Sequence, residues 1–157
     1  MNTKGQILLE SVVAITVAVL GLLGMFSLLS RSVNLSKTIT DRYIASHFAA
    51  EGVEVVKNMI DTNVLGGSPW NRGLNPGEYE VDYDDLAPES NNNRLIFLDA
   101  ATGRYGYGTG SPTIFKRKIM LATLGGGKEM RVNSVVSWAR RGGEFEINVE
   151  DHFFDWK

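Results

Sequence analysis

A long apolar segment with one acidic residue opens the chain. Between Gly5 and Ser30 the only charged residue is Glu10, and Ser11–Ser30 are twenty consecutive uncharged residues. Twenty helical residues at about 1.5 Å each span a hydrocarbon core about 30 Å thick. A single segment in lipid must satisfy its own backbone hydrogen bonds, so the pattern predicts a membrane-spanning helix over residues 6–30.

An amphipathic pattern follows over residues 31–62. Its apolar positions recur every three or four residues, which is typical of one face of a helix. We therefore expect one helix from about Gln6 to Ile60, ended by the polar residues and glycines of 61–67. The apolar stripe consists of Ile44, Phe48, Gly52, Val55 or Val56, and Met59.

Short alternating runs between glycine-rich and proline-rich turns make up residues 63–157, and they predict β-strands. Glycine turns between alternating strands favour an antiparallel meander, whose apolar face must be buried against the amphipathic half of the helix. The sequence thus predicts an α+β fold, in which a long N-terminal helix packs on a small antiparallel sheet. The expected strands are Tyr79–Tyr83, Arg94–Leu98, Ile114–Ala122, a fourth with Met130, Val132, Val136 and Trp138 on one face, and a fifth with Phe145, Ile147 and Val149 on one face. Residues 68–77 and 99–111 are expected to be loops.

Composition narrows the classes of function. The length of 157 residues fits one ordinary domain with a moderate core, and 43% hydrophobic residues argue against a disordered chain. Sixteen basic and eighteen acidic residues give no overall nucleic-acid signature. The absence of cysteine excludes disulfides, thiol nucleophiles and cysteine-ligated zinc.

Two simpler interpretations of the apolar segment fit less well. A secretory signal has an apolar stretch of about 7–15 residues before a small-x-small cleavage site. Here the run is longer, a carboxylate interrupts it, and the first such site, Ser30-Arg31-Ser32, is a poor match. A plain single-span anchor leaves Glu10 unexplained, because a carboxylate in a membrane segment costs roughly 2–3 kcal/mol unless it has a partner or reaches the headgroup layer.

The residues around Glu10 resemble a known processing motif. The run Lys4-Gly5-Gln6-Ile7-Leu8-Leu9-Glu10-Ser11-Val12-Val13-Ala14-Ile15 is similar to the start of type IV pilins and pseudopilins. In that family a prepilin peptidase cuts after the glycine of a short basic leader, the new first residue is N-methylated, and the fifth residue after the cut is glutamate. The resemblance implies a leader over residues 1–5, cleavage between Gly5 and Gln6, methylation of Gln6, and an assembly role for Glu10.

Physical chemistry gives Glu10 a purpose within this resemblance. Cleavage creates a cationic amine at the start of an apolar helix, and the carboxylate can pair with that amine on its own chain or on a neighbour. In a low-dielectric filament core such a pair fixes axial register more than it adds stability. The family usually has phenylalanine where this chain has Gln6. That difference, together with the run Ala49–Glu54, favours a minor pilin or a pseudopilin such as the I-type subunits of secretion systems.

The family also implies location and partners. The subunit would be a single-pass protein of the inner or cytoplasmic membrane, with its N-terminus in the cytoplasm and its head outside. It would later enter an extracellular filament or a periplasmic pseudopilus. Its partners would be other pilin or pseudopilin subunits, the prepilin peptidase and the assembly platform. Adhesion and motility pili, DNA-uptake machines and protein secretion systems all use such subunits.

Catalytic motifs in the head are weak. His47 and His152 are the only histidines, and no serine lies in a Gly-x-Ser-x-Gly elbow, so we expect no enzyme. The run Gly103–Gly110 lacks the Lys-Ser/Thr and the following helix of a phosphate-binding loop, and a glycine-aromatic surface loop explains it better.

Two binding hypotheses remain for the head. Asp82, Asp84 and Asp85 offer hard oxygen ligands that suit calcium, although an acidic solvated edge is the commoner explanation. No other cofactor is expected. Basic residues at 116–118 and 140–141 suggest DNA, but adjacent strand residues point to opposite faces, so only Lys116 and Lys118 share one.

The sequence therefore predicts a structural subunit of a type IV pilus-like filament. Its expected parts are a leader (1–5), a transmembrane and filament-core helix (6–30), an amphipathic continuation (31–62) and an antiparallel β head (63–157). The alternative is a single-pass, membrane-anchored extracellular domain with a binding or enzymatic role.

Overall fold

The computed structural model describes residues 3–140 and 142–155. Its first element is α1 (Thr3–Leu65), a helix of 63 residues that contains the whole of the expected helix from Gln6 to Ile60. The chain divides into two compact units, an N-terminal unit of residues 1–41 and a C-terminal unit of residues 42–157. The N-terminal unit is helical throughout its described residues, and residues 42–65 of the helix belong to the C-terminal unit.

The end of α1 lies at the glycine pair that the sequence indicated. Ser68 N–H donates to Asn63 O at 2.9 Å and Gly67 N–H donates to Val64 O at 3.2 Å. Gly67 has φ 71°, a left-handed conformation that glycine adopts without steric cost. These two bonds satisfy carbonyls that the helix end leaves open, so the helix stops here and the chain reverses.

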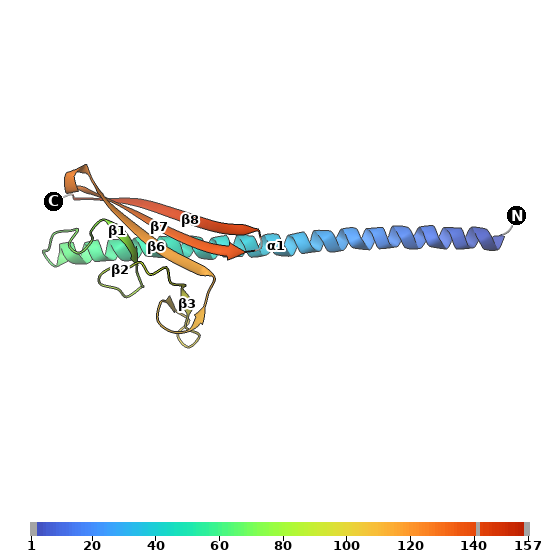
Figure 1. The fold of residues 1–157 in the computed structure, drawn as a ribbon, viewed down its shortest axis with the longest axis horizontal. Helices are drawn as coiled ribbons and strands as arrows, with labels where there is room; N and C mark the ends of the chain where they lie inside the picture. The colour runs from blue at the N-terminus through green and yellow to red at the C-terminus, as the bar shows by residue number, and fades with distance from the viewer. Residues whose placement is uncertain (1–2, 141, 156–157) are drawn as a thin grey trace. The chain divides into compact units, whose positions relative to one another are not determined.

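Two antiparallel sheets follow α1, and Figure 1 shows that the longer strands run beside its C-terminal part. The larger sheet has the order β2-β1-β6-β7-β8, and the smaller has the order β4-β3-β5. A short 3-10 helix, η1 (Gly125–Gly127), joins β6 to β7. The strands are β1 (Gly77–Glu80), β2 (Glu89–Ser90), β3 (Phe97–Leu98), β4 (Tyr105–Gly106), β5 (Ser111–Pro112), β6 (Phe115–Leu124), β7 (Glu129–Arg140) and β8 (Gly143–Phe154).

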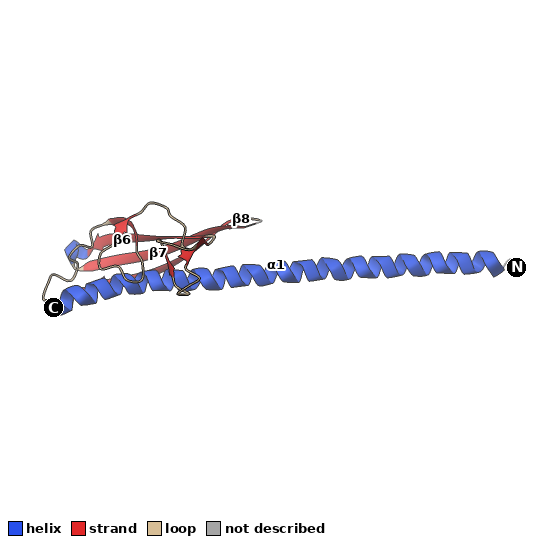
Figure 2. Ribbon diagram, turned by 90° about the horizontal axis from the view of Figure 1, so that it is seen from below, coloured by secondary structure: helices blue, strands red, loops and turns tan. Residues whose placement is uncertain are grey.

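The predicted fold class is confirmed. One long N-terminal helix packs on a small antiparallel sheet, and in the C-terminal unit the strands lie along one side of residues 42–65 (Figure 2). The three long strands β6, β7 and β8 form the predicted meander. The inward face of β7 carries the residues that alternation assigned to it, since Met130, Val132, Val136 and Trp138 are all buried. Phe145, Ile147 and Val149 of β8 lie on the same face and are half-buried.

The shorter strands differ from the prediction. β1 ends at Glu80 instead of Tyr83, because the chain turns where Asp82 and Asp85 bond to nearby backbone groups. The expected strand Arg94–Leu98 shortens to β3, which belongs to the smaller sheet. The expected loop 99–111 contains β4 and the first residue of β5, and β2 was not predicted. A pairing of two residues is too short to leave a periodic signal.

The core of the C-terminal unit consists of two apolar clusters between helix and sheet. The apolar stripe of α1 contributes residues to both clusters. Its members Phe48, Val55, Val56 and Met59 are at most 5% exposed. Gly52 marks a close approach of helix and sheet, because a Cβ there would lie 2.5 Å from Ser134 Oγ and 2.7 Å from Ile119 Cδ1. The first cluster contains Val53, Val55, Val56, Met59, Ile60, Leu74, Val81, Ile119, Leu121, Met130 and Val132. The second contains Ala45, Phe48, Ala49, Ile96, Tyr107, Phe115, Val136 and Trp138.

Candidate functional site

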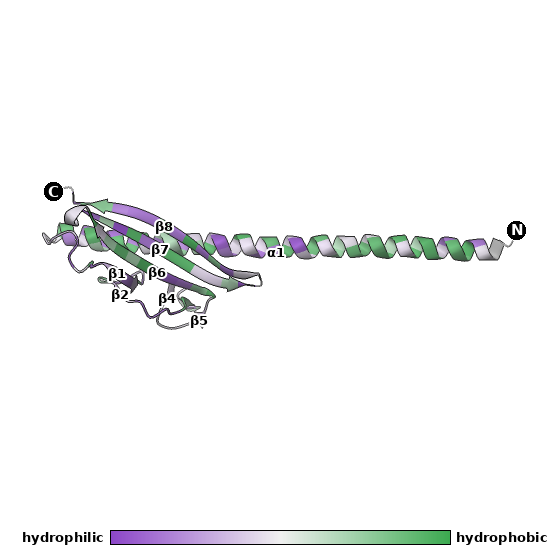
Figure 3. Cartoon of the chain, turned by 45° about the horizontal axis from the view of Figure 1, so that its top comes forward, coloured by the Kyte–Doolittle hydropathy of each residue, from purple (hydrophilic) through white to green (hydrophobic). Residues whose placement is uncertain are grey.

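The N-terminal part of α1 exposes apolar surface on every side. Each large apolar side chain from Ile7 to Leu29 is between 47% and 69% exposed, and Figure 3 shows hydrophobic colour along this part of the helix. By length and hydropathy α1 can cross a membrane once. Apolar surface of this extent is unfavourable in water, so lipid or other protein must cover it.

Hydroxyl groups in this part of the helix bond to their own backbone. Ser11 Oγ donates to Ile7 O at 2.8 Å, and Thr16 Oγ1 donates to Val12 O at 2.8 Å. Such bonds to the preceding turn satisfy a hydroxyl without an outside partner. These two polar side chains are therefore compatible with hydrocarbon surroundings.

The carboxylate of Glu10 cannot donate a hydrogen bond to a backbone carbonyl as these hydroxyls do. Its side chain is exposed, and it forms no ion pair with any side chain that the structure describes. A carboxylate has two acceptor oxygens and no donor, so in hydrocarbon it needs a cation or hydrogen-bond donors from elsewhere. The structure thus places a single acidic group on an otherwise apolar, exposed stretch of helix.

The predicted cleavage bond lies in the first turns of the same helix. Gly5 and Gln6 are both helical and close to the start of α1 at Thr3. Apart from its chain neighbours and its own turns of helix, no described residue comes within 4 Å of a Cβ built on Gly5. Met1 and Asn2 of the predicted leader lie outside the described residues. The first turn of a helix lacks half of its backbone bonds and opens easily, so a peptidase can reach this bond without disturbing a core.

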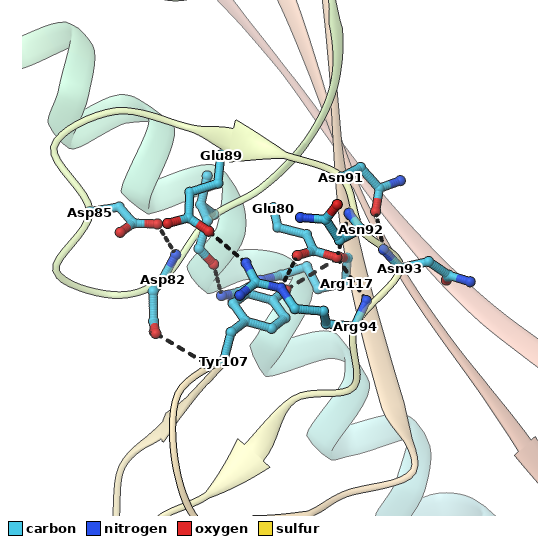
Figure 4. Close-up of polar contacts among 11 residues, drawn as sticks. Glu80, Asp82, Asp85, Glu89, Asn91, Asn92, Asn93, Arg94, Tyr107 and Arg117 are labelled. Carbon is cyan, nitrogen blue, oxygen red and sulfur yellow. Dashed lines mark hydrogen bonds and ion pairs between the residues drawn. The ribbon is translucent and has the colours of Figure 1, made fainter.

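In the C-terminal unit the sequence interpretation missed a buried acidic group. Glu80 alternates with Tyr79 and Val81 and therefore lies on the outer face of β1, yet its side chain is fully buried. The chain at Asn92–Arg94 covers it. The backbone N–H of Asn92 donates to Glu80 Oε1 at 3.1 Å, and that of Arg94 donates to the same oxygen at 2.8 Å. Arg94 Nε donates to Glu80 Oε2 at 2.6 Å (Figure 4). The alternation itself was correct, but the covering loop changed the environment.

Arg94 bridges two facing carboxylates. Glu80 and Glu89 lie directly opposite each other in the β1–β2 pair, an arrangement that would otherwise be repulsive. Arg94 Nη2 reaches Glu89 Oε2 at 2.6 Å, and the guanidinium lies 4.7 Å from the centre of the Tyr107 ring. The hydrogen bond to Glu80 raises the pKa of Arg94 above its ordinary value. The cluster holds the edge of the sheet and the loop before β3 together.

Arg117 was expected in a basic surface run but is buried. Its Nη1 donates to Phe48 O at 3.0 Å and its Nη2 to Val81 O at 2.6 Å. Nη1 also lies 3.2 Å from Glu51 Oε1 on the helix. The guanidinium therefore connects α1, β6 and the chain after β1. Its inward position follows from the alternation with Phe115, so the signal was present in the sequence.

The other basic residues of the two runs do not form one continuous basic surface. Lys116 and Lys118 are half-buried on the outer face of β6, as expected, and Lys118 Nζ lies 2.9 Å from Glu78 Oε1. Arg140 ends β7, while Arg141 lies outside the described residues. The DNA hypothesis thus loses Arg117. Among the described residues it keeps Lys116, Lys118 and Arg140, and Lys118 is paired with an acidic side chain.

The calcium candidates are not arranged as a ligand set. Asp82 accepts hydrogen bonds from the backbone N–H groups of Tyr83 at 2.8 Å and Tyr107 at 3.2 Å, and Asp85 accepts one from Asp82 N at 2.6 Å. Burial raises the pKa of Asp85 above its ordinary value. Asp84 is exposed. Within residues 3–140 and 142–155, no group of three or more histidine, aspartate or glutamate side chains is placed to hold a metal ion.

The glycine-aromatic segment is only partly a surface loop. Gly108–Gly110 are exposed, but Tyr107 is buried in the second apolar cluster, and its hydroxyl donates to Arg117 O at 3.3 Å. The two histidines lie on different elements. His47 packs edge-on against Tyr43 in α1, with ring centroids 4.4 Å apart, and His152 in β8 contacts Glu129 and Glu150.

Comparison of the chain with models of protein families, with curated proteins and with solved structures gave no match.

Proposed function

We propose that this chain is a structural subunit, a minor pilin or pseudopilin, of a type IV pilus-like filament. The observation that carries the proposal is the exposed apolar stretch of α1 with the single carboxylate of Glu10. A membrane span explains the apolar surface, but within hydrocarbon it gives the carboxylate no partner, and only the headgroup layer could satisfy it. A filament of parallel helices supplies both a cover for the surface and a cation for Glu10.

The proposed maturation begins in the membrane. The chain inserts as a single span, with its N-terminus in the cytoplasm and its C-terminal unit outside. The prepilin peptidase hydrolyses the bond between Gly5 and Gln6, which frees the amine of Gln6, and a methyl group is then added to that amine. Because Gln6 and Glu10 are one helical turn apart, about 6 Å along the axis, the new amine and the carboxylate lie near the same end of the span.

Assembly then stacks the helices of successive subunits. A neighbouring helix at the correct axial offset brings its Gln6 amine to Glu10, and other offsets leave a charge unpaired in hydrocarbon. Glu10 therefore acts on register, while the apolar residues supply most of the attraction. The self-bonded hydroxyls of Ser11 and Thr16 do not compete for the amine.

Intact-mass analysis of the membrane form tests the processing step. The chain is purified from cells that contain the peptidase and from cells that lack it. In the first we expect a mass that corresponds to loss of residues 1–5 and addition of one methyl group, and in the second the uncut mass. An uncut chain in both would contradict the proposal.

A Glu10→Leu variant tests the assembly step. We expect normal membrane insertion and cleavage but strongly reduced incorporation into filaments, because the register-setting pair is lost. Ser11→Leu is a matched control, since it adds a similar apolar side chain one residue further along the same exposed helix. Equal incorporation of both variants would refute the role of Glu10.

A second candidate is a membrane-anchored extracellular domain. The C-terminal unit is compact and has its own apolar clusters, as an independent binding or enzymatic domain would. In that case residues 1–30 serve only as an anchor. An uncut chain that stays monomeric in the membrane would favour this candidate.

A further inference from the structure

The last strand of the larger sheet has an open edge. β8 is 12 residues long, pairs only with β7 in the described sheet, and lies outermost in Figure 1. Asp155 N–H donates to Lys128 O at 2.9 Å, which fixes the phase of the β7–β8 ladder. Because backbone groups alternate in direction, those of Glu144, Glu146, Asn148 and Glu150 point away from β7, toward the open edge.

The inner face of β8 is incompletely covered. Phe145, Ile147, Val149 and Phe153 pack against the two apolar clusters, yet all four remain half-buried. Their register partners on the central strand β7 are Met130, Ser134, Val136 and Trp138, which are at most 5% exposed. The apolar core is thus open along one side of β8. A further strand beside it would complete the cover.

The outer face of β8 is acidic. Glu144 and Glu146 point outward from the sheet and are exposed, and the sequence has no lysine or arginine from residue 143 to residue 155. Glu150 lies on the same face but already contacts Asn133, Arg131 and His152. A second copy of β8 paired at this edge would place like charges side by side on the outer face, which disfavours self-pairing. A strand with basic side chains on its outer face would be favoured.

We propose that the edge of β8 binds an extended segment of a different protein, in which apolar and basic residues alternate. The backbone of the segment would pair with the edge-directed groups of β8, as in strand addition to other sheets. Its apolar residues would cover Phe145, Ile147 and Val149, and its basic residues would lie beside Glu144 and Glu146. This inference does not depend on the filament proposal, because it concerns only the C-terminal unit.

A model peptide tests the inference directly. The probe is a capped and fluorescently labelled peptide of about ten alternating valine and lysine residues, long enough to cover most of β8. Its anisotropy is measured against the full chain in neutral detergent micelles, with empty micelles as background. We expect saturable binding, and binding about tenfold weaker for a peptide of the same composition in which the valines and lysines form two separate blocks.

Two substitutions in β8 separate strand addition from general charge attraction. Asn148→Pro removes an edge-directed donor without removing a bond to β7, and Asn148→Ala is its matched control because both lose the amide side chain. We expect the proline variant to bind at least tenfold more weakly than the alanine variant. Glu146→Lys should weaken binding about two- to tenfold.

Hydrogen exchange provides a readout on the unaltered chain. Bound peptide should slow exchange at the amides of Glu146, Asn148 and Glu150, which the β7 ladder does not protect. Equal binding of the alternating and block peptides, or unchanged exchange at these amides under saturation, would overturn the proposal. A chain that dimerises through β8, with dimers abolished by Asn148→Pro, would also overturn it, because the occupant would then be a second copy.

Discussion

Replacing Gly52 with alanine tests how closely α1 approaches the sheet in the C-terminal unit. The added methyl carbon would lie 2.5 Å from Ser134 Oγ, 2.7 Å from Ile119 Cδ1 and 3.1 Å from Arg117 Cδ. Ser134 and Ile119 are fully buried and Arg117 is 3% exposed, so none of them can move into solvent without opening the core. The helix and the sheet must therefore separate, or the side chains must leave their preferred rotamers.

Two opposing effects decide the magnitude. Alanine stabilises a helix interior by about 1 kcal/mol relative to glycine. Overpacking a close-packed core typically costs about 1–3 kcal/mol. Because two buried atoms would lie closer than 3.0 Å to the new carbon, we place the packing cost near the top of that range. The expected net loss in the free energy of unfolding is about 1–2 kcal/mol.

Urea unfolding of the full chain in detergent micelles measures this loss. Tryptophan fluorescence is a suitable signal, because Trp138 lies in the second apolar cluster and is 5% exposed. With a slope of about 2 kcal/mol per molar urea, the midpoint should fall by about 0.5–1 M. Gly21→Ala is the matched control, since the same change in the same helix meets no atom within 4 Å. Its midpoint should not fall.

The nearest atom gives a further check on the reasoning. Ser134 Oγ is buried and has no hydrogen-bond partner among the described residues, so Ser134→Ala removes both the closest contact and an unsatisfied hydroxyl. In the Gly52→Ala background this second substitution should recover part of the lost stability, as a non-additive pair. If Gly52→Ala alone raises the midpoint as helix propensity predicts, the close contact is refuted.

Two further predictions concern charged groups in the C-terminal unit. In urea unfolding, Glu80→Gln should lower the free energy of unfolding by about 2–4 kcal/mol, and Glu89→Gln should lower it by less than about 1 kcal/mol. Both carboxylates lie 2.6 Å from Arg94, but the side chain of Glu80 is fully buried and that of Glu89 is 57% exposed. Equal losses would contradict the role of burial. The hydrogen bonds with Glu129 and then Glu150 raise the pKa of His152, so its contribution to stability is complete below the ordinary value near 6.5 and is lost as pH rises through the raised value. The difference in unfolding midpoint between the wild type and His152→Gln should therefore be larger at about pH 5 than at about pH 9, and a difference that grows with pH would refute this sign.

The elements that the sequence predicted well are those with a long periodic signal. α1 has an uninterrupted apolar and amphipathic pattern, and β6 to β8 each alternate over at least ten residues between glycine turns. Periodicity over such lengths reflects burial on one face, which the fold must satisfy. The pairs of two residues in β2 to β5 depend on neighbouring loops, and no local pattern specifies them.

The burial of individual charged side chains was harder to predict than the secondary structure. The alternation placed Glu80 on the outer face correctly, but only the fold shows that the chain at Asn92–Arg94 covers that face. Arg117 could have been found, because its register places it inward with Phe115 and Ile119. The predicted residues Gly5, Gln6 and Glu10 do lie together near the start of an exposed apolar helix, and their roles stay predictions because they need an enzyme and a neighbouring subunit.

The contribution of α1 to the core determines where the chain can be shortened. Both apolar clusters take members from the helix between Ala45 and Ile60, so a truncation at residue 62, where the sequence changes from apolar stripe to turns, would remove the helical half of each. Arg117 would also lose its acceptor at Phe48 and its partner Glu51. A shortened chain without the exposed apolar part of α1 must therefore retain residues 42–65, the helical share of the compact C-terminal unit.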